Sequence, residues 1–151
     1  MKRILIIEDD QYKLEKIKKF IEEQYPRFDI TVKTSFHSGF EEVVENSESY
    51  SLILLDMSMQ NYDISSDEAG GDPAPLAGKS ILTQMYFREI PTDVVVVTMY
   101  EHFQDGTKIK DLHSTLTEEF NENYKGYVFF SHLDNDKWMN DLKAYLNNYY
   151  D

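Results

Sequence analysis

Short, unbroken runs of apolar residues constrain the fold of this chain more than any other feature. Three of these runs, residues 4–7, 52–55 and 94–97, contain only Ile, Leu or Val. A strand that faces water on one side alternates apolar and polar residues, so an unbroken run indicates a strand buried on both faces. Such strands are typical of a parallel sheet that helices cover on both sides.

The segments between these runs predict helices. In residues 11–24 apolar side chains recur every three or four positions, Asp10 can cap the first turn, and Pro26 follows the last. Similar spacing predicts four more helices, one beginning after Ser35 or Ser38 and the others at 79–88, 105–123 and 138–149. Further strands are predicted at 30–34 and 127–130.

Strands that alternate with helices predict an α/β fold, because parallel neighbours need helical crossovers and these are right-handed. We expect a flavodoxin-like (βα)5 doubly wound parallel sheet with strand order 2-1-3-4-5. One domain over residues 1–151 suits the length of the chain.

The stretch 57–78 interrupts this pattern. It is rich in Ser, Asp, Gly and Pro, which favour neither helix nor strand. We expect an extended loop here, and a functional flap and a disordered excursion are both compatible with the composition.

Charge and cysteine content limit the function. A net charge of −13 disfavours binding to nucleic acid or to anionic lipid, which depends on clustered Lys and Arg. The chain has no cysteine and no apolar run long enough for a signal peptide or a membrane span, so we expect a cytoplasmic protein. The one basic stretch, Lys13, Lys16, Lys18 and Lys19, is interpreted as the solvated face of the first helix.

Carboxylates follow two of the predicted strands. Glu8 and Asp9 come after the first strand and Asp56 after the third. Ligands of such sheets bind beyond the carboxyl ends of the strands, so these acids are expected to lie together. Carboxylates at close range repel one another unless a cation with oxygen ligands, such as Mg²⁺, lies between them. The alternative is that Asp9 only caps a helix and Asp56 only ends a strand.

Four segments resemble the receiver domains of two-component response regulators: 4–10 (ILIIEDD), 52–57 (LILLDM), 94–98 (VVVVT) and 126–128 (GYV). The resemblance spans nearly the whole chain. It implies that Glu8, Asp9, Asp56 and the backbone carbonyl of Ser58 hold Mg²⁺, and that Asp56 is the phosphoacceptor.

The same resemblance implies a switch. Thr98 would be the hydroxyl that binds the phosphoryl group, and Tyr127 would be the aromatic side chain that moves in response. An ordinary core tyrosine is the alternative for Tyr127.

The chain departs from the family at the end of the fifth strand, where receivers usually carry a lysine and then a proline. Phe130 and Ser131 stand there instead. Lys125 lies at the far end of that strand and Lys137 in the last helix, so neither is well placed to replace the lysine. We therefore expect the phosphoryl mimic beryllofluoride to bind weakly, and Phe130→Lys to improve the binding.

Two functions remain open, and neither is that of an enzyme. One is an atypical stand-alone receiver in phosphorelay signal transduction, which contacts a histidine kinase or an output protein in trans, since no output domain follows the last helix. The other is a phosphorylation-independent pseudo-receiver, purely an interaction module. A phosphatase with an aspartate nucleophile is disfavoured, because such enzymes carry a second acid where Ser58 stands. A homodimer is left open.

Overall fold

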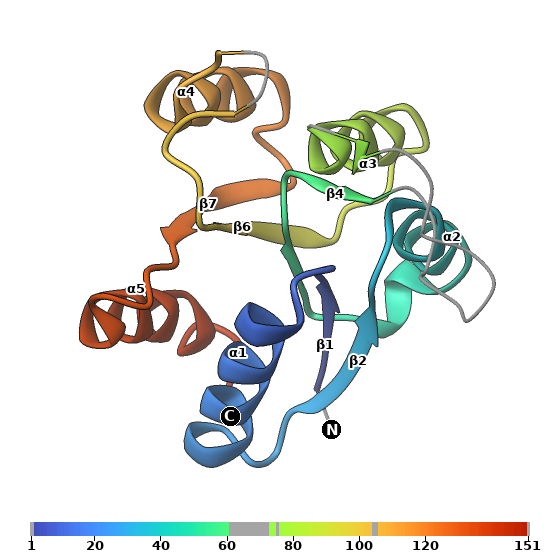
Figure 1. Cartoon of the computed structure of the whole chain (residues 1–151). Helices are drawn as coiled ribbons and strands as arrows, with labels where there is room; N and C mark the ends of the chain where they lie inside the picture. Colours follow the sequence, from blue (N-terminus) through green and yellow to red (C-terminus); the bar gives the residue numbers. More distant parts are fainter. Residues whose placement is uncertain (1, 61–72, 75, 104–105, 151) are drawn as a thin grey trace, which may run out of the picture.

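A five-stranded parallel sheet forms the centre of the molecule (Figure 1). The computed structural model describes residues 2–60, 73–74, 76–103 and 106–150. Across the sheet the strands are β2 (Asp29–Lys33), β1 (Arg3–Ile7), β3 (Leu52–Leu55), β6 (Asp93–Thr98) and β7 (Tyr124–Phe129). All neighbours are parallel. This confirms the predicted flavodoxin-like order.

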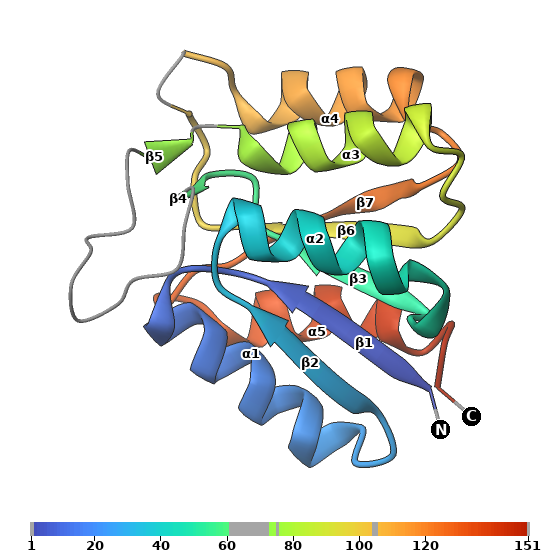
Figure 2. The same ribbon diagram turned by 90° about the vertical axis from the view of Figure 1, so that its right-hand side faces the viewer.

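Helices cover both faces of this sheet (Figure 2). One face carries α1 (Gln11–Gln24) and α5 (Asn135–Leu146), and the other carries α2 (Phe36–Asn46), α3 (Ala77–Phe87) and α4 (Ile109–Glu119), with a short 3-10 helix, η1 (Ser47–Ser49), after α2. In β1, Ile4 and Ile6 pack with α1 and α5, whereas Leu5 and Ile7 pack with the other three helices. Burial on both faces explains why residues 4–7 of this strand are all apolar, while Arg3 at its partly exposed start is not.

Side-chain caps fix where three of the helices begin. Asp10 accepts a hydrogen bond from the Lys13 backbone N–H at 2.9 Å, and Ser35 accepts one from the Ser38 N–H at 3.1 Å. Asp134 plays the same part for α5. The fourth helix is shorter than the predicted 105–123, because the apolar spacing continues to Phe120 beyond its last turn. The fifth has the length of the predicted 138–149 but begins three residues earlier, at Asn135. No helix in the described residues is long and apolar enough to cross a bilayer.

The stretch 57–78 is more ordered at its ends than its composition predicts. Two short antiparallel strands, β4 (Met59–Gln60) and β5 (Pro73–Ala74), pair with each other, and α3 begins at Ala77 rather than Lys79. The prediction of no strand is wrong at these ends, because the Met57 and Met59 side chains are buried in the core. Residues 61–72 and 75 lie outside the described residues, so the extended loop stays a prediction there.

Candidate functional site

Three carboxylates meet at the carboxyl end of β1 and β3. These strands pair so that Ile7 lies opposite Leu55, and the Asp56 N–H donates to the Ile7 carbonyl at 3.0 Å. Glu8, Asp9 and Asp56 each offer one oxygen, and the three oxygens lie within 4.8 Å of one another. The convergence expected from the strand ends is therefore confirmed, and an all-oxygen donor set of this kind fits a hard divalent cation.

Two of these acids are almost completely buried. Glu8 is 2% exposed and Asp56 is 4% exposed, whereas Asp9 is partly exposed. Burial raises the pKa of the Glu8 carboxyl well above its usual value, although the nearby Lys13 ammonium opposes the rise. Two buried carboxylates whose oxygens lie within 4.8 Å of each other need a positive partner.

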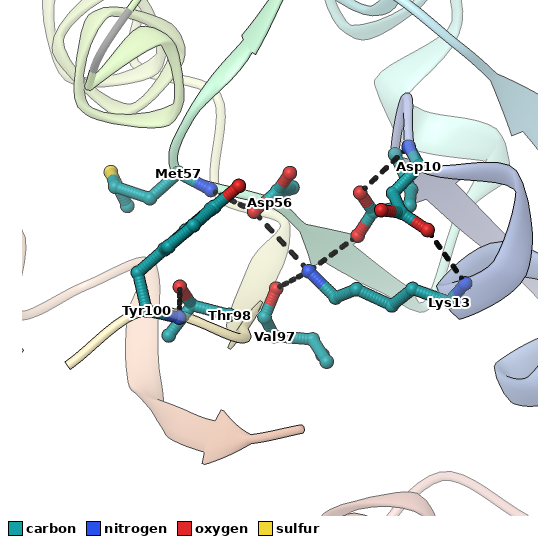
Figure 3. A network of polar contacts seen from close by, with 8 residues as sticks. Asp10, Lys13, Asp56, Met57, Val97, Thr98 and Tyr100 are labelled. Carbon is teal, nitrogen blue, oxygen red and sulfur yellow. Dashed lines mark hydrogen bonds and ion pairs between the residues drawn. The ribbon is translucent and has the colours of Figure 1, made fainter. Parts of the chain in front are cut away.

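Lys13 of α1 provides that partner (Figure 3). Its side chain is fully buried, at 0% exposure. The Nζ atom lies 2.6 Å from Glu8 Oε1 and 3.2 Å from Asp56 Oδ1, and it donates to the Val97 carbonyl at 2.6 Å. An ammonium has three donors, and these contacts match them. Burial alone lowers the pKa of Lys13, but Asp56 and Glu8 raise it above its usual value, so the ammonium stays charged.

The interpretation of Lys13 as part of a solvated basic face is wrong. It holds for Lys16, Lys18 and Lys19, which are exposed. A signal was present in the sequence, since Lys13 precedes the buried Ile17 by four positions and so lies on the same face of the helix. The surface preference of lysine hid this relation.

Asp10, in the connection from β1 to α1, orients both Glu8 and Lys13. The Asp10 N–H donates to Glu8 Oε2 at 3.2 Å, while the Asp10 carboxylate caps the helix turn that carries Lys13. On the β3 side, Asp56 Oδ1 also accepts from the Met57 N–H at 2.8 Å. Backbone donors therefore orient both buried carboxylates.

Thr98 ends β6 beside this network. Its side chain is buried, and its Oγ1 accepts a hydrogen bond from the Tyr100 N–H at 3.2 Å. The Tyr100 side chain extends across the Asp56 side of the network (Figure 3). Burial raises the pKa of its hydroxyl, and Asp56 adds to the rise. Ser58, Tyr100, His102 and Phe103 line a cavity of about 240 Å³.

Tyr127 lies apart from the acids, on β7. It is half-buried against the α2–α4 side of the core, and its ring centroid is 5.2 Å from that of His113. It also lines a cavity of about 500 Å³ together with Lys108, Ile109 and Phe129. This cavity offers space next to the tyrosine.

The position after β7 is apolar. Phe130 is 1% exposed, and its ring centroid lies 4.9 Å from that of Trp138. Its N–H donates to the Thr98 carbonyl at 2.8 Å, which fixes it at the same end of the sheet as Asp56. The two lysines nearby in sequence have other ion-pair partners, Asp93 for Lys125 at 3.6 Å and Asp141 for Lys137 at 2.9 Å.

Known proteins are similar to this chain in sequence or in fold. No protein-family model matches the chain. The Detocs response regulatory protein DtcB of Enterobacter cloacae (strain JD6301) is 34% identical over 145 residues, which cover 93% of this chain and 95% of that protein. A response regulator receiver domain from Clostridium thermocellum superposes with a TM-score of 0.61 at 18% identity, over 98% of both chains. The Mn²⁺-bound response regulator Rcp1 gives 0.62 at 14% identity, over 97% of this chain and 94% of that one.

The fold, the acidic end of the sheet and these likenesses define the class of protein. The chain belongs to the response regulator receiver family. In this chain the buried Phe130 follows β7, and Lys13 reaches Asp56 from α1.

Proposed function

We propose that this protein is a receiver that accepts a phosphoryl group on Asp56 in the cytoplasm and signals through contact with a protein partner. The observation that carries the proposal is the setting of Asp56. Its carboxylate is buried, lies 3.2 Å from an ammonium, and shares a 4.8 Å cluster with Glu8 and Asp9. Such a site concentrates charge around one nucleophilic oxygen.

The chemistry is a displacement at phosphorus. An Asp56 carboxylate oxygen forms a bond to phosphorus, the bond from phosphorus to the leaving group of the donor breaks, and its electron pair departs with that group. The donor is a phosphohistidine of a kinase or a small phosphodonor. Little covalent work falls to the protein, so positioning and charge stabilisation supply the catalysis.

Glu8, Asp9 and Asp56, with the Ser58 backbone carbonyl, would hold Mg²⁺. When bound, this ion supplies positive charge next to the phosphoryl oxygens. Rcp1, which shares the fold, has been described with Mn²⁺ bound. The all-oxygen donor set of this chain supports the same class of ligand.

The signal would leave through Thr98 and Tyr127. Thr98 Oγ1 is buried at the end of β6, where a phosphoryl group on Asp56 would offer it a hydrogen-bond acceptor. A shift of Thr98 would alter packing toward β7, and the cavity of about 500 Å³ leaves room for Tyr127 to move. The surface of α4 and β7 is then the part that a partner would read.

Intact mass spectrometry tests this function. After incubation with Mg²⁺ and acetyl phosphate, the natural protein should gain the mass of one phosphoryl group, and Asp56→Asn should gain none. Asp111→Asn, on an exposed position of α4, is the matched control and should gain the group normally. A natural protein that gains no mass, or an Asp56→Asn variant that still does, contradicts the proposal.

The second candidate is a pseudo-receiver that binds its partner without phosphorylation. The buried, donor-free side chain of Phe130 favours it, since the usual neutralising lysine is missing from that place. Failure of the natural protein to take up phosphoryl, with partner binding unaffected by Asp56→Asn, would select this candidate.

A further inference from the structure

We propose that Lys13, from the first helix, performs the task that a lysine after the fifth strand performs in other receivers: its ammonium contacts the phosphoryl group on Asp56 and links it to the end of β6. This inference rests on the proposed function and names a residue for it. The task would then fall to α1 and not to the residue after β7.

Lys13 contacts the group that would react. Lys13 Nζ already lies 3.2 Å from Asp56 Oδ1, on the carboxylate that would carry the phosphoryl group. Because the side chain is fully buried, the ammonium is held at this end of the sheet. An acyl phosphate carries more negative charge than the carboxylate it replaces and offers more acceptor oxygens, so the ammonium gains a stronger partner.

Among the described residues, the β7 side of the site supplies no ammonium to Asp56. Phe130 offers no donor, and its ring packs on Trp138 within the core. The ammonium groups of Lys125 and Lys137 form ion pairs with Asp93 and Asp141. Among the described residues, Lys13 is the one lysine for which an ion pair with Asp56 is found.

Lys13 is also bonded to β6, the strand that ends in Thr98. Lys13 also donates to the Val97 carbonyl at 2.6 Å, and Val97 directly precedes Thr98 on β6. All three donors of the ammonium are in use, so a new bond to a phosphoryl oxygen must replace or weaken one of them. A phosphoryl group on Asp56 would therefore change the bond between Lys13 and the strand that ends in Thr98.

A purely structural role for Lys13 and direct contact with the phosphoryl group predict different effects of its removal on ligand binding. The ammonium occupies two of the three acids that would hold a metal, Glu8 and Asp56. Its removal should leave Mg²⁺ binding unchanged or tighter, since a competing cation is lost, yet it should weaken binding of a phosphoryl mimic. Damage to the fold would weaken both.

The experiment is a beryllofluoride titration in saturating Mg²⁺, followed by calorimetry and by the fluorescence of Trp138, the only tryptophan. A separate titration measures the Mg²⁺ affinity. The proteins are the natural chain, Lys13→Met, Asp56→Asn, and Lys16→Met, which removes an exposed lysine of the same helix. Lys13→Gln, which keeps two hydrogen-bond donors, carries the test if Lys13→Met does not fold.

We expect beryllofluoride to bind Lys13→Met at least about tenfold more weakly than the natural protein, with Mg²⁺ affinity undiminished and Lys16→Met unchanged. Equal beryllofluoride affinity in Lys13→Met would overturn the inference and leave the proposed function standing. Parallel loss of Mg²⁺ and beryllofluoride binding would assign Lys13 a structural role and also overturn it. A natural protein that binds no beryllofluoride would overturn both the inference and the proposed function.

Discussion

The two sides of the Asp56 site differ in chemical character: one is ionic and the other is apolar. On the α1 side, a buried ammonium bridges Glu8 and Asp56. On the β7 side, Phe130 and Trp138 form an apolar contact with ring centroids 4.9 Å apart. In this chain the charge of the buried acids is therefore offset from α1, while the β7 side contributes packing and no charge.

Each side is consistent with its surroundings. Lys13 sits in the first turn of α1, where the Asp10 cap fixes its backbone and two carboxylates compensate for its burial. Phe130 belongs to the core cluster shared by α1 and α5, which gains from a large apolar ring. Exchange of the two kinds of side chain would therefore harm both sides.

The largest effect should come from Lys13→Met in metal-free buffer. Removal of one partner from a buried ionic network leaves the Glu8 and Asp56 carboxylates uncompensated, so we expect the free energy of unfolding to fall by about 3–5 kcal/mol. Urea denaturation measures this, and added Mg²⁺ should recover part of the loss. A loss within the error of the Lys16→Met control would mean that the α1 side is not what compensates the acids.

Phe130→Lys tests the β7 side, with Phe130→Leu as the apolar control. We expect Phe130→Leu to lower the free energy of unfolding by about 1–2 kcal/mol through lost packing on Trp138. Phe130→Lys should cost more, because it places an ammonium in an apolar cluster. It should not tighten beryllofluoride binding, since Lys13 already supplies the charge. A clear gain in affinity would support the expectation drawn from the sequence, that the site lacks a cation.

Asp9→Asn tests whether the partly exposed acid completes a metal site. Millimolar Mg²⁺ should raise the melting temperature of the natural protein by binding the folded state. The free energy of unfolding should rise by about 1–2 kcal/mol at Mg²⁺ concentrations some tenfold or more above the Kd. Asp9→Asn should lose most of it. Asp10→Asn keeps the helix cap and should retain the gain. An equal thermal shift in Asp9→Asn and the natural protein would exclude Asp9 as a ligand.

The smallest effect is expected from Lys125→Gln. This lysine pairs with Asp93 at 3.6 Å on the surface, and exposed pairs contribute little to stability. Phosphoryl uptake and the unfolding midpoint should match those of the natural protein. Slower uptake would show that the β7 strand contributes a cation after all, and the contrast between the two sides would weaken.

The sequence predicted the parallel sheet and the convergence of Glu8, Asp9 and Asp56 because both follow from the apolar runs and from the residues that come directly after them. Unbroken apolar runs identify buried parallel strands, and the residues that follow them share one edge. Neither inference needs any knowledge of side-chain packing.

The burial of Lys13 was not predicted, because it depends on partners that lie 5 and 43 positions away in the sequence. Judged by local composition, a lysine next to other lysines is a surface residue. The ordered ends of the 57–78 stretch were not predicted for a related reason. Met57 and Met59 are isolated apolar residues in polar surroundings, and only the tertiary structure shows the core that they enter.

A crystal structure of the natural protein with Mg²⁺ and beryllofluoride would test the central claim most directly. We predict that the beryllofluoride group is attached to Asp56, that Lys13 Nζ lies within hydrogen-bond distance of one of its fluorine atoms, and that Phe130 remains packed on Trp138. A group on Asp56 with Lys13 still bound only to Glu8 and Val97, or turned away from the site, would contradict the account.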